Sequence, residues 1–384
     1  MNLILFDGPQ WKDLYPLTLT RPVAELRLGI STLREKWELR LGTTSSTCTE
    51  SYLQTKYPLV ASSDNLVVNA AVLPQDLIVD QILKLKPEQR LQWNGQFIAG
   101  RTHLVPCHLI EAEGMQDVEA KVEPVIIRYP WDVFRLNEVA MALDMEMIKP
   151  KQNGNTGRHN VLLGDKIYIH ETAEVQAAVL NSETGPIWIG PGAKVMEGAM
   201  LRGPIAVCEG AEVKMGAKIY GPTTIGPHCK VGGELNNVVI TGYTNKAHDG
   251  FLGNSVIGEW CNLGADTNCS NLKNNYGEVR VHHMASGKAI GTGLQFCGLI
   301  MGDHSKAGIN TMFNTGTVAG VNANIFGGGF QSKFIPSFSW GGEQQSPVYE
   351  FDKAAAVAEQ VMGRRGKTFE ETDRQILRHV YDHR

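Results

Sequence analysis

The sequence predicts an α/β domain, followed by a solenoid of short parallel strands and a helical tail. Strand-like and helix-like segments alternate at the start of the chain, which is typical of α/β layer folds with a largely parallel sheet. Further on, every sixth residue is apolar, and the last segment is helical without this repeat. We therefore divide the chain into an α/β domain at 1–150, a linker at 151–168, a solenoid at 169–342 and a helical tail at 343–384.

The composition excludes several classes of protein. At 384 residues the chain is long enough for two domains with cores of their own. A net charge of −4 with 20% charged residues does not suit a general nucleic-acid-binding surface. The seven cysteines show no metal-binding spacing, so we expect free thiols in a reducing cytoplasm. No apolar run reaches membrane-spanning length, and we expect no signal peptide and no membrane partner.

The first domain shows distinct strand, helix and turn signals. Apolar runs predict strands at Asn2–Asp7 and Asn65–Ala71. Ser31 or Thr32 can cap a helix that runs to about Arg40. Asn94-Gly95 between two strand-like runs predicts a hairpin. Helices are also predicted at 76–85 and at 131–147, with Pro150 ending the last one.

The six-residue repeat fits neither a helix nor a single strand, whose apolar periods are 3.6 and 2. Proline and glycine punctuate the gaps between the apolar positions. Such internal repeats indicate a solenoid in which each apolar residue points inward and stacks on its equivalent in the next coil. The repeat positions are Ile189, Val195, Leu201, Val207, Val213, Ile219, Ile225 and Val231.

The regular spacing stops after Val231 and resumes at Ile257 and again at Met301. Loops that leave a solenoid coil are common places for functional sites, so we expect the site in these breaks. The first break carries the segment Lys246-Ala247-His248-Asp249-Gly250-Phe251-Leu252-Gly253, and the resumed repeat at residues 257–271 reads IGEWCNLGADTNCSN.

These segments resemble motifs of the bifunctional N-acetylglucosamine-1-phosphate uridyltransferase/glucosamine-1-phosphate acetyltransferase family. Residues 246–253 are similar to its K-A-G-H-x-x-Y-L-G motif, and residues 257–271 to IGDxxNIGAGTxTCN. The segment LTRPVAELRLGISTLREKW at 19–37 resembles a shorter branch of sugar nucleotidyltransferases. The resemblance implies a nucleotidyltransferase-like α/β domain, a left-handed parallel β-helix with acetyl-CoA as co-substrate, and a homotrimer.

The resemblance makes His248 the catalytic base of the acetyltransferase. An amino-sugar nitrogen must be neutral to attack a thioester, and histidine is the side chain whose ordinary pKa suits this proton transfer. Asp249 follows directly and is expected to orient or charge-balance His248. By the same resemblance, Ala265 contacts the coenzyme, and Ile309 and Ala323 lie in a coil that lines the acetyl-CoA groove.

Substrate binding is predicted from the same region. Asn271 falls on the family's substrate-binding asparagine. The arginine and lysine that bind the sugar phosphate in the family have uncharged counterparts here, so we expect Lys246 and Lys273 to replace them. Glu234 enters the same region and is expected to bind a sugar hydroxyl or the amine. His282 and His283 lie in an apparent insertion, and we expect them to be non-catalytic.

A nucleotide site is predicted in the first domain, where Arg21, Glu25, Arg27 and Lys36 form the best candidate anion site. Asp132 is the candidate ligand for the Mg²⁺ that nucleotidyl transfer from an NTP requires. The family's Gly-x-Gly loop is missing here. The alternative is that Arg27 and Lys36 are solvated helix-face charges and that Asp132 is only an N-terminal helix charge or cap.

The leading hypothesis is a cytoplasmic sugar-nucleotide biosynthesis enzyme, of the kind that supplies the cell envelope. It N-acetylates an amino-sugar 1-phosphate, glucosamine 1-phosphate being the best guess, and it transfers a nucleotidyl group from an NTP. One alternative keeps a single activity, with the first domain as a sugar-nucleotide-binding or scaffold module, and another treats the solenoid as an assembly scaffold. In the tail, Thr368 and Glu371 predict a capping box. The basic turn at 363–367 is expected to be solvated, the alternative being contact with a coenzyme phosphate.

Overall fold

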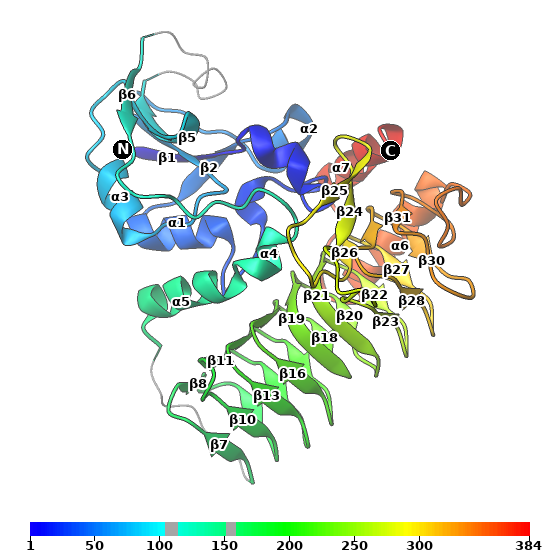
Figure 1. Ribbon diagram of the computed structural model, residues 1–384. Helices are drawn as coiled ribbons and strands as arrows, with labels where there is room; N and C mark the ends of the chain where they lie inside the picture. The colour runs from blue at the N-terminus through cyan, green and yellow to red at the C-terminus, as the bar shows by residue number, and fades with distance from the viewer. Residues whose placement is uncertain (104–113, 151–158) are drawn as a thin grey trace.

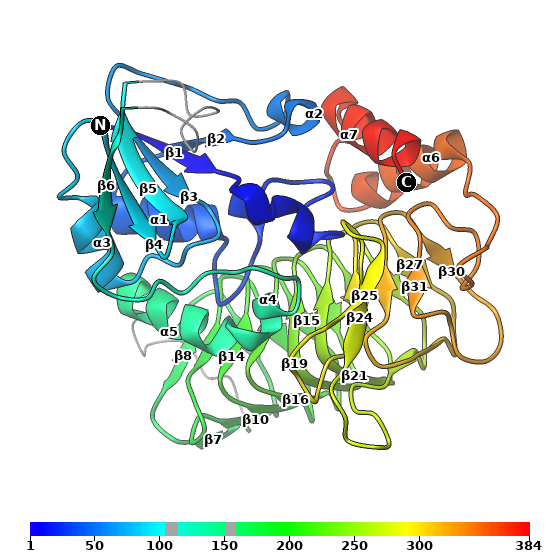
Figure 2. The ribbon, with the colours of Figure 1, turned by 45° about the horizontal axis from the view of Figure 1, so that its top comes forward.

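The computed structural model describes residues 1–103, 114–150 and 159–384 (Figure 1). Cys107 and residues 151–158 of the expected linker lie outside the described residues. The chain forms an α/β domain, a long stack of β-coils and two C-terminal helices (Figure 2). This arrangement confirms the fold class predicted from the sequence.

The first domain is built on a sheet with the strand order β2-β1-β3-β5-β4-β6. β1 is parallel to β2 and β3, and β4 to β6, whereas β5 is antiparallel to β3 and β4. The sheet is therefore mixed rather than largely parallel, because the Asn94-Gly95 turn, with both residues at positive φ, reverses the chain as a tight hairpin. The strands are β1 (Asn2–Phe6), β2 (Ser45–Cys48), β3 (Asn65–Asn69), β4 (Gln89–Trp93), β5 (Gln96–Thr102) and β6 (Gln116–Glu119).

Short helices surround this sheet. Thr32 caps α1 and forms a capping box with Glu35, as its sequence position predicts. The helix expected at 131–147 is divided at Leu136 into α4 and α5. The helical elements are η1 (Pro9–Leu14), η2 (Val23–Glu25), α1 (Leu33–Leu41), α2 (Ser51–Gln54), α3 (Asp76–Ile82), α4 (Asp132–Arg135) and α5 (Asn137–Ile148).

The solenoid is a parallel β-helix whose coils present three faces. The first face contains β7 (Val161–Leu163), β10 (Val179–Asn181), β13 (Met200–Arg202), β16 (Lys218–Tyr220), β23 (Asn268–Cys269) and β28 (Met312–Phe313). The second contains β8 (Ile167–Ile169), β11 (Ile187–Ile189), β14 (Ile205–Val207), β17 (Thr223–Ile225), β26 (Ile300–Met301), β29 (Val318–Ala319) and β31 (Phe334–Ile335). The third contains β9 (Glu174–Val175), β12 (Lys194–Val195), β15 (Glu212–Val213), β18 (Lys230–Val231), β20 (Asn245–Lys246), β22 (Asn262–Leu263), β27 (Lys306–Ala307) and β30 (Asn324–Ile325).

The β-helix begins at β7, inside the segment 151–168 that the sequence analysis assigned to the linker. β7 and β8 pair with β10 and β11 of the next coil, although the three side chains of β7 are exposed. Leu162 is in register with the buried Leu180, but it lies seven residues before Ile169, so the six-residue pattern does not mark this first coil. All eight repeat positions between Ile189 and Val231 are buried in the core of the β-helix, as predicted.

The coil continues through the first predicted break. β19 (Glu234–Ile240) and β21 (Phe251–Ile257) each run from the first face onto the second, with Asn237 and Asn254 at positive φ at the bend. The His248 segment is therefore a turn within a coil and not a loop thrown out of it. The sequence pattern is lost because two successive corners are shorter than usual. Leu235 follows Val231 by only four residues, and the single left-handed Asn237 forms the corner between Leu235 and Ile240.

The segment that does leave the β-helix is a hairpin of β24 (Arg280–His283) and β25 (Lys288–Gly291). Its apolar residues share one core cluster with the first domain and with outward-facing residues of the second face, among them Val281, Trp131 and Val256. The ring of His283 packs edge-on against Tyr129, and its Nε2 lies 3.1 Å from a carboxylate oxygen of Asp13. The insertion thus joins the two domains, which fits the expected non-catalytic role of its histidines.

Two helices, α6 (Phe351–Gly363) and α7 (Glu371–Asp382), follow the last coil. Their apolar residues pack with Val321 and Phe338 at the end of the β-helix. α7 also reaches the first domain, where His379 stacks on Tyr52 (Figure 2). The capping box of α7 is formed by Glu370 and Asp373 instead of the predicted Thr368 and Glu371, because the helix begins at Glu371.

Candidate functional site

A groove of about 700 Å³ lies between the third face of the β-helix and the C-terminal end of α6. Asn245 and Asn262 are in register on neighbouring strands and form part of its floor. Val361 and the two arginines that follow α6 form its other wall. The groove is therefore formed without a residue from the first domain.

His248 lies at the edge of this groove together with Ala265 and Ile309. The His248 side chain is exposed. Neighbouring coils bring these residues together, since the Asp266 amide donates to the Asp249 carbonyl (3.1 Å) and the Asn310 amide to the Ala265 carbonyl (2.8 Å). Three residues predicted to act at the acetyl-transfer site are thus placed in one groove.

The groove is rich in basic side chains from elements far apart in the sequence. The sequence analysis expected the turn at 363–367 to be solvated, but Arg364 and Arg365 line the groove opposite Lys306 and Lys230. Arg365 docks the turn on the β-helix by donating to Asn245 Oδ1 at 2.8 Å. Within the described residues, Arg364 forms no side-chain hydrogen bond or ion pair, which leaves its guanidinium available for an anion.

The other predicted substrate residues do not line the groove. The side-chain Nδ2 of Asn271 donates to Asn254 Oδ1 at 2.7 Å. Lys273 Nζ donates to the Glu278 backbone carbonyl at 2.8 Å. Glu234 lies on the first face, in register with Phe251. Ala323 is buried inside the β-helix, so it cannot contact a coenzyme in this groove.

Lys246 and Asp249 also differ from their predicted roles. Lys246 is 1% exposed, and its ammonium donates to the carbonyl oxygens of His248 and Asp249. It is therefore unavailable to bind a sugar phosphate. Asp249 is exposed, and no hydrogen bond joins its carboxylate to the His248 ring in the part of the chain that the structure describes.

The residues predicted to bind a nucleotide are engaged in structural contacts. Lys36 is fully buried and donates to both carboxylate oxygens of Asp144, at 2.8 and 2.7 Å. It also donates to the carbonyl oxygen of Leu28 at 2.7 Å. Burial lowers the pKa of Lys36, although Asp144 opposes that effect. The alternative of a solvated Lys36 is wrong as well, because the side chain is sealed between α1 and α5.

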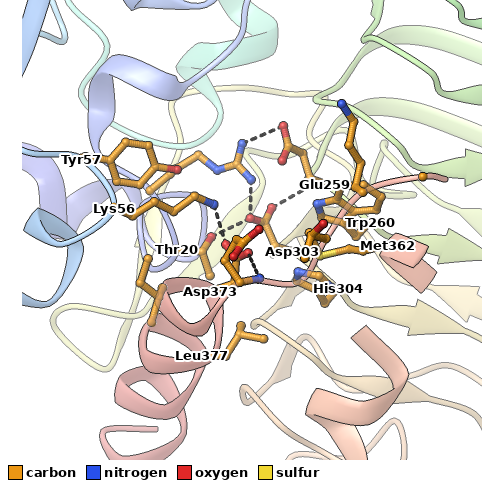
Figure 3. A pocket seen from close by; sticks show the side chains of 16 residues that line it. Thr20, Lys56, Tyr57, Glu259, Trp260, Asp303, His304, Met362, Asp373 and Leu377 are labelled. Atoms are coloured by element: carbon orange, nitrogen blue, oxygen red, sulfur yellow. Dashed lines mark hydrogen bonds and ion pairs between the residues drawn. The ribbon is translucent and has the colours of Figure 1, made fainter. Parts of the chain in front are cut away.

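Arg21 is buried at the junction of the two domains. It pairs with Glu259 at 3.1 Å and with Asp303, and the Thr20 hydroxyl donates to the same Asp303 carboxylate at 2.6 Å (Figure 3). These carboxylates belong to the β-helix, so Arg21 holds the first domain on the solenoid. Sequence patterns do not reveal this contact, because its partners are 282 residues apart.

Glu25 and Arg27 likewise have partners within the first domain. Glu25 accepts a hydrogen bond from Arg34 Nε at 2.5 Å. Arg27 donates to the Ile30 carbonyl and lies 3.4 Å from a Glu35 carboxylate oxygen. The four residues predicted to form an anion site therefore do not converge on one cavity.

Asp132 is not a suitable Mg²⁺ ligand. One carboxylate oxygen accepts the Arg128 and Tyr129 amides, at 2.8 and 3.0 Å, and the other accepts from Arg135 Nε at 2.8 Å. The side chain instead closes the turn that precedes α4. It is an acidic residue in the first turn of that helix and not its cap, because α4 has no side-chain cap hydrogen bond. Among residues 1–103, 114–150 and 159–384, no group of three potential metal-binding side chains is present.

A second cavity of about 440 Å³ lies where the first domain, the β-helix and the C-terminal helices meet (Figure 3). Its charged side chains are largely paired with one another, as in the ion pair between Lys56 and Asp373 at 2.6 Å. Burial lowers the pKa of His304 to about 3, so its ring is neutral. This cavity therefore offers a ligand fewer free charged groups than the groove beside His248.

The carboxyl ends of β1 and β3 hold a polar cluster that the sequence analysis missed. In an α/β sheet this edge is the usual place for ligands. Gln10 Nε2 donates to Asn69 Oδ1 at 2.7 Å, whereas Gln10 Oε1 is buried with no hydrogen-bond partner among the described residues. Asp7 accepts from the Val23 amide at 2.8 Å and from the Thr49 hydroxyl at 2.5 Å. The only sequence signal was an aspartate directly after a buried strand.

We expect Asp7→Asn to raise the melting temperature by several degrees at pH 8 and to have little effect near pH 4. Burial raises the pKa of Asp7 to about 7, more than the hydrogen bonds from Thr49 and Val23 lower it. Between about pH 4 and pH 7 the unfolded chain is ionised here while the folded protein keeps its proton, so wild-type stability falls as pH rises. Thermal unfolding of both proteins from pH 4 to 8 checks this, and a constant difference between them would contradict it.

Comparison with known proteins shows what the first domain is similar to. Residues 3–153 match the model of a family described as sugar nucleotidyl transferase. The match spans the whole first domain, including the segment at 19–37 that suggested the resemblance.

Two curated relatives are named as bifunctional proteins, and the name of the first gives both activities. A bifunctional sugar-1-phosphate nucleotidylyltransferase/acetyltransferase of Sulfurisphaera tokodaii is 30% identical over 201 residues, 52% of this chain and 44% of that protein. The bifunctional protein GlmU of Methanocaldococcus jannaschii is 34% identical over 92 residues, 24% of this chain and 22% of that protein. The chain thus spans less than half the length of either relative. These relatives are transferases, and they confirm the resemblance stated from the sequence.

A solved hexapeptide transferase family protein from Anaplasma phagocytophilum also aligns with the chain. It is 14% identical, and the alignment covers 58% of this chain and 92% of that one, with a TM-score of 0.23. Such a low score supports no conclusion about function. Within the described residues, no helix is both long and apolar enough to cross a lipid bilayer.

Proposed function

We propose that the chain transfers an acetyl group from acetyl-CoA to the amino nitrogen of a sugar 1-phosphate, with glucosamine 1-phosphate as the first substrate to test. The observation that carries this proposal is the groove that joins an exposed imidazole, His248, to a basic wall that includes Arg364 and Lys306. Acyl-CoA has a thioester at one end and phosphates at the other. A groove of about 700 Å³ with a base at its edge and cations in its wall suits such a ligand.

The His248 ring would act as the general base. The amino nitrogen attacks the thioester carbonyl while the ring takes up the proton that the nitrogen loses. The tetrahedral intermediate then collapses, the C–S bond breaks, and the coenzyme thiolate leaves and takes a proton. No covalent acyl-enzyme is needed, because the amine attacks directly.

An amide near Ala265 is expected to stabilise the oxyanion. The Asp266 and Thr267 amides donate to backbone carbonyls, at 3.1 and 3.2 Å. Within the described residues the Ala265 amide has no such backbone partner, so Ala265 is our candidate for the oxyanion donor.

We expect Arg364→Gln to raise the KM for acetyl-CoA about tenfold while changing kcat little, because Arg364 would contact a phosphate that is remote from the reacting atoms. Steady-state release of the CoA thiol at varied acetyl-CoA concentration measures this. Arg378→Gln is the matched control, since Arg378 lies on α7 outside the groove and pairs with Asp382 at 3.0 Å. Equal KM values in wild type and Arg364→Gln would remove Arg364 from the proposed site.

We propose nucleotidyl transfer as a second activity, supported by the family match of residues 3–153. Arg21, Lys36 and Asp132 are withdrawn from this proposal, since each is held by structural partners. The polar cluster of Asp7, Gln10 and Asn69 at the carboxyl edge of the sheet is the place to test instead. No step is assigned to Mg²⁺, because the residue predicted to bind it does not fit.

A pyrophosphate-release assay with UTP or dTTP, Mg²⁺ and sugar 1-phosphates separates the alternatives for the first domain. Release that is lost in Asn69→Ala would support the second activity at this edge. Binding of a sugar nucleotide without pyrophosphate release would favour the alternative of a binding or scaffold module.

The resemblance further suggests a homotrimer, which we propose as the assembly. Met215 and Ile309 are 71% and 73% exposed on the corner of the β-helix near His248. Such apolar side chains suit contact with another copy. Light scattering after size-exclusion chromatography would give the mass of a trimer if this is correct and that of a single chain if it is not.

A further inference from the structure

Lys246 occupies a position that is apolar in the preceding coils. In the third face, Lys246 of β20 is in register with Val231, and Val231 with Val213. Both valines are buried in the core of the β-helix. A lysine at this inward position is 1% exposed. Burying an amine here costs free energy unless its hydrogen-bonding capacity is used.

The Lys246 ammonium is used to hold the turn that carries His248. It donates to the carbonyl oxygens of His248 and Asp249, the second at 3.0 Å. The Asp249 carbonyl also accepts the Asp266 amide of the next coil, at 3.1 Å. No ion pair to Lys246 is present in the described ranges of the chain. The side chain is thus a bridge from inside the β-helix to two successive carbonyls of one turn.

We propose that Lys246 is a positioning residue that fixes the backbone of His248 and thereby aims its imidazole into the groove. This inference rests on the proposed acetyl transfer. The His248 ring is exposed and has no side-chain hydrogen bond within the described residues, so its direction depends on where its backbone is held. A small displacement of a catalytic group is costly, on the order of 10²-fold for about 1 Å.

The same contact makes the turn sensitive to pH. Burial lowers the pKa of Lys246 to about 8, and the carboxylates of Asp249 in its own turn and Asp266 in the next coil act in the opposite direction. Below about pH 8 the amine is charged and makes charge-assisted hydrogen bonds to the carbonyls. As the pH rises above that value these bonds weaken. The kcat for acetyl transfer is therefore expected to fall on the alkaline side.

The test is Lys246→Met in the full-length chain. Methionine has a similar length and is apolar, so it suits the stack of valines and removes a buried charge. We expect kcat for acetyl transfer to fall about 10- to 100-fold, with the KM for acetyl-CoA unchanged and no alkaline fall in kcat. Hydrogen exchange of the amides at 247–252 should become faster. Lys194→Met, on β12 of the same face but outside the groove, is the matched control and should behave as wild type.

The outcomes separate this inference from the proposed function. If wild type is active and Lys246→Met keeps its kcat, its pH profile and its amide protection, the positioning role is wrong. If wild type transfers acetyl to no amino-sugar phosphate, the proposed function fails, and hydrogen exchange still decides whether Lys246 holds the turn. Should the methionine variant not fold, Lys246→Gln, which retains a neutral donor, is expected to lower kcat and to lack the alkaline fall.

Discussion

Replacing His248 by alanine is expected to lower the kcat for acetyl transfer about 10²- to 10⁴-fold, the range that a positioned general base provides. The imidazole is exposed at the edge of the groove, and within the described residues its side chain makes no hydrogen bond that stabilises the fold. The melting temperature should therefore stay within about one degree of wild type, since such surface substitutions change stability little. Release of the CoA thiol in the presence of glucosamine 1-phosphate measures the loss.

The control for this prediction is His170→Ala. His170 is also exposed on the β-helix, at the start of the stack, where its Nδ1 lies 2.9 Å from the Thr172 hydroxyl. It should retain full activity. Undiminished activity of His248→Ala would rule out the assignment of the base, and the search would then move to the second cavity at the domain junction.

Lys36→Met is expected to lower the free energy of unfolding by about 3–5 kcal/mol, the usual cost of removing one partner of a buried ion pair. Asp144 would remain in the interior with its charge, although the Ile30 amide still donates to it at 2.6 Å. The double variant Lys36→Met/Asp144→Asn should recover part of the loss, because the carboxylate left without its cation is neutralised. Urea denaturation of the three proteins measures both effects.

This experiment also distinguishes a structural lysine from a nucleotide-binding one. The structure predicts that Lys36→Met destabilises the first domain and that any loss of NTP binding follows the unfolded fraction. A stable Lys36→Met protein that has lost NTP binding would reinstate the role predicted from the sequence.

The β-helix could be predicted from the sequence, because its repeat is local and each apolar position is read from its own coil. His248, Ala265 and Ile309 were also predicted to act together, and the structure places them in one groove. Their spacing along the chain is fixed by the coil length, so a motif in the sequence becomes a cluster in space.

The places of the remaining residues could not be predicted from the sequence, because they depend on contacts between distant segments; for the turn at 363–367, phosphate contact was only the alternative to a solvated turn. Arg364 reaches the groove only because α6 packs against the end of the β-helix. Arg21 has the residue type of a phosphate-binding group, but Asp303 lies 282 residues away in the chain and neutralises it in the fold. Lys246 was assigned to substrate by its closeness to the motif, whereas the register of β20 turns it inward.

The place of the insertion at 274–299 could not be predicted either, because it also depends on contacts with distant segments. Its sequence marked it only as extra length relative to the family. In the fold, Val279 and Val281 join the core that connects the first domain to the second face of the β-helix. A segment with no counterpart in a motif can therefore carry a structural role that depends entirely on where its neighbours fold.

The proposed acetyl transfer requires that acetyl-CoA binds in the groove beside His248. A crystal structure of the protein with CoA and glucosamine 1-phosphate tests this directly. We predict density for the coenzyme in the groove between the third face and α6, with its phosphates beside Arg364 and its sulfur next to His248. Density for CoA at any other place, with this groove empty at saturating ligand, would contradict the account.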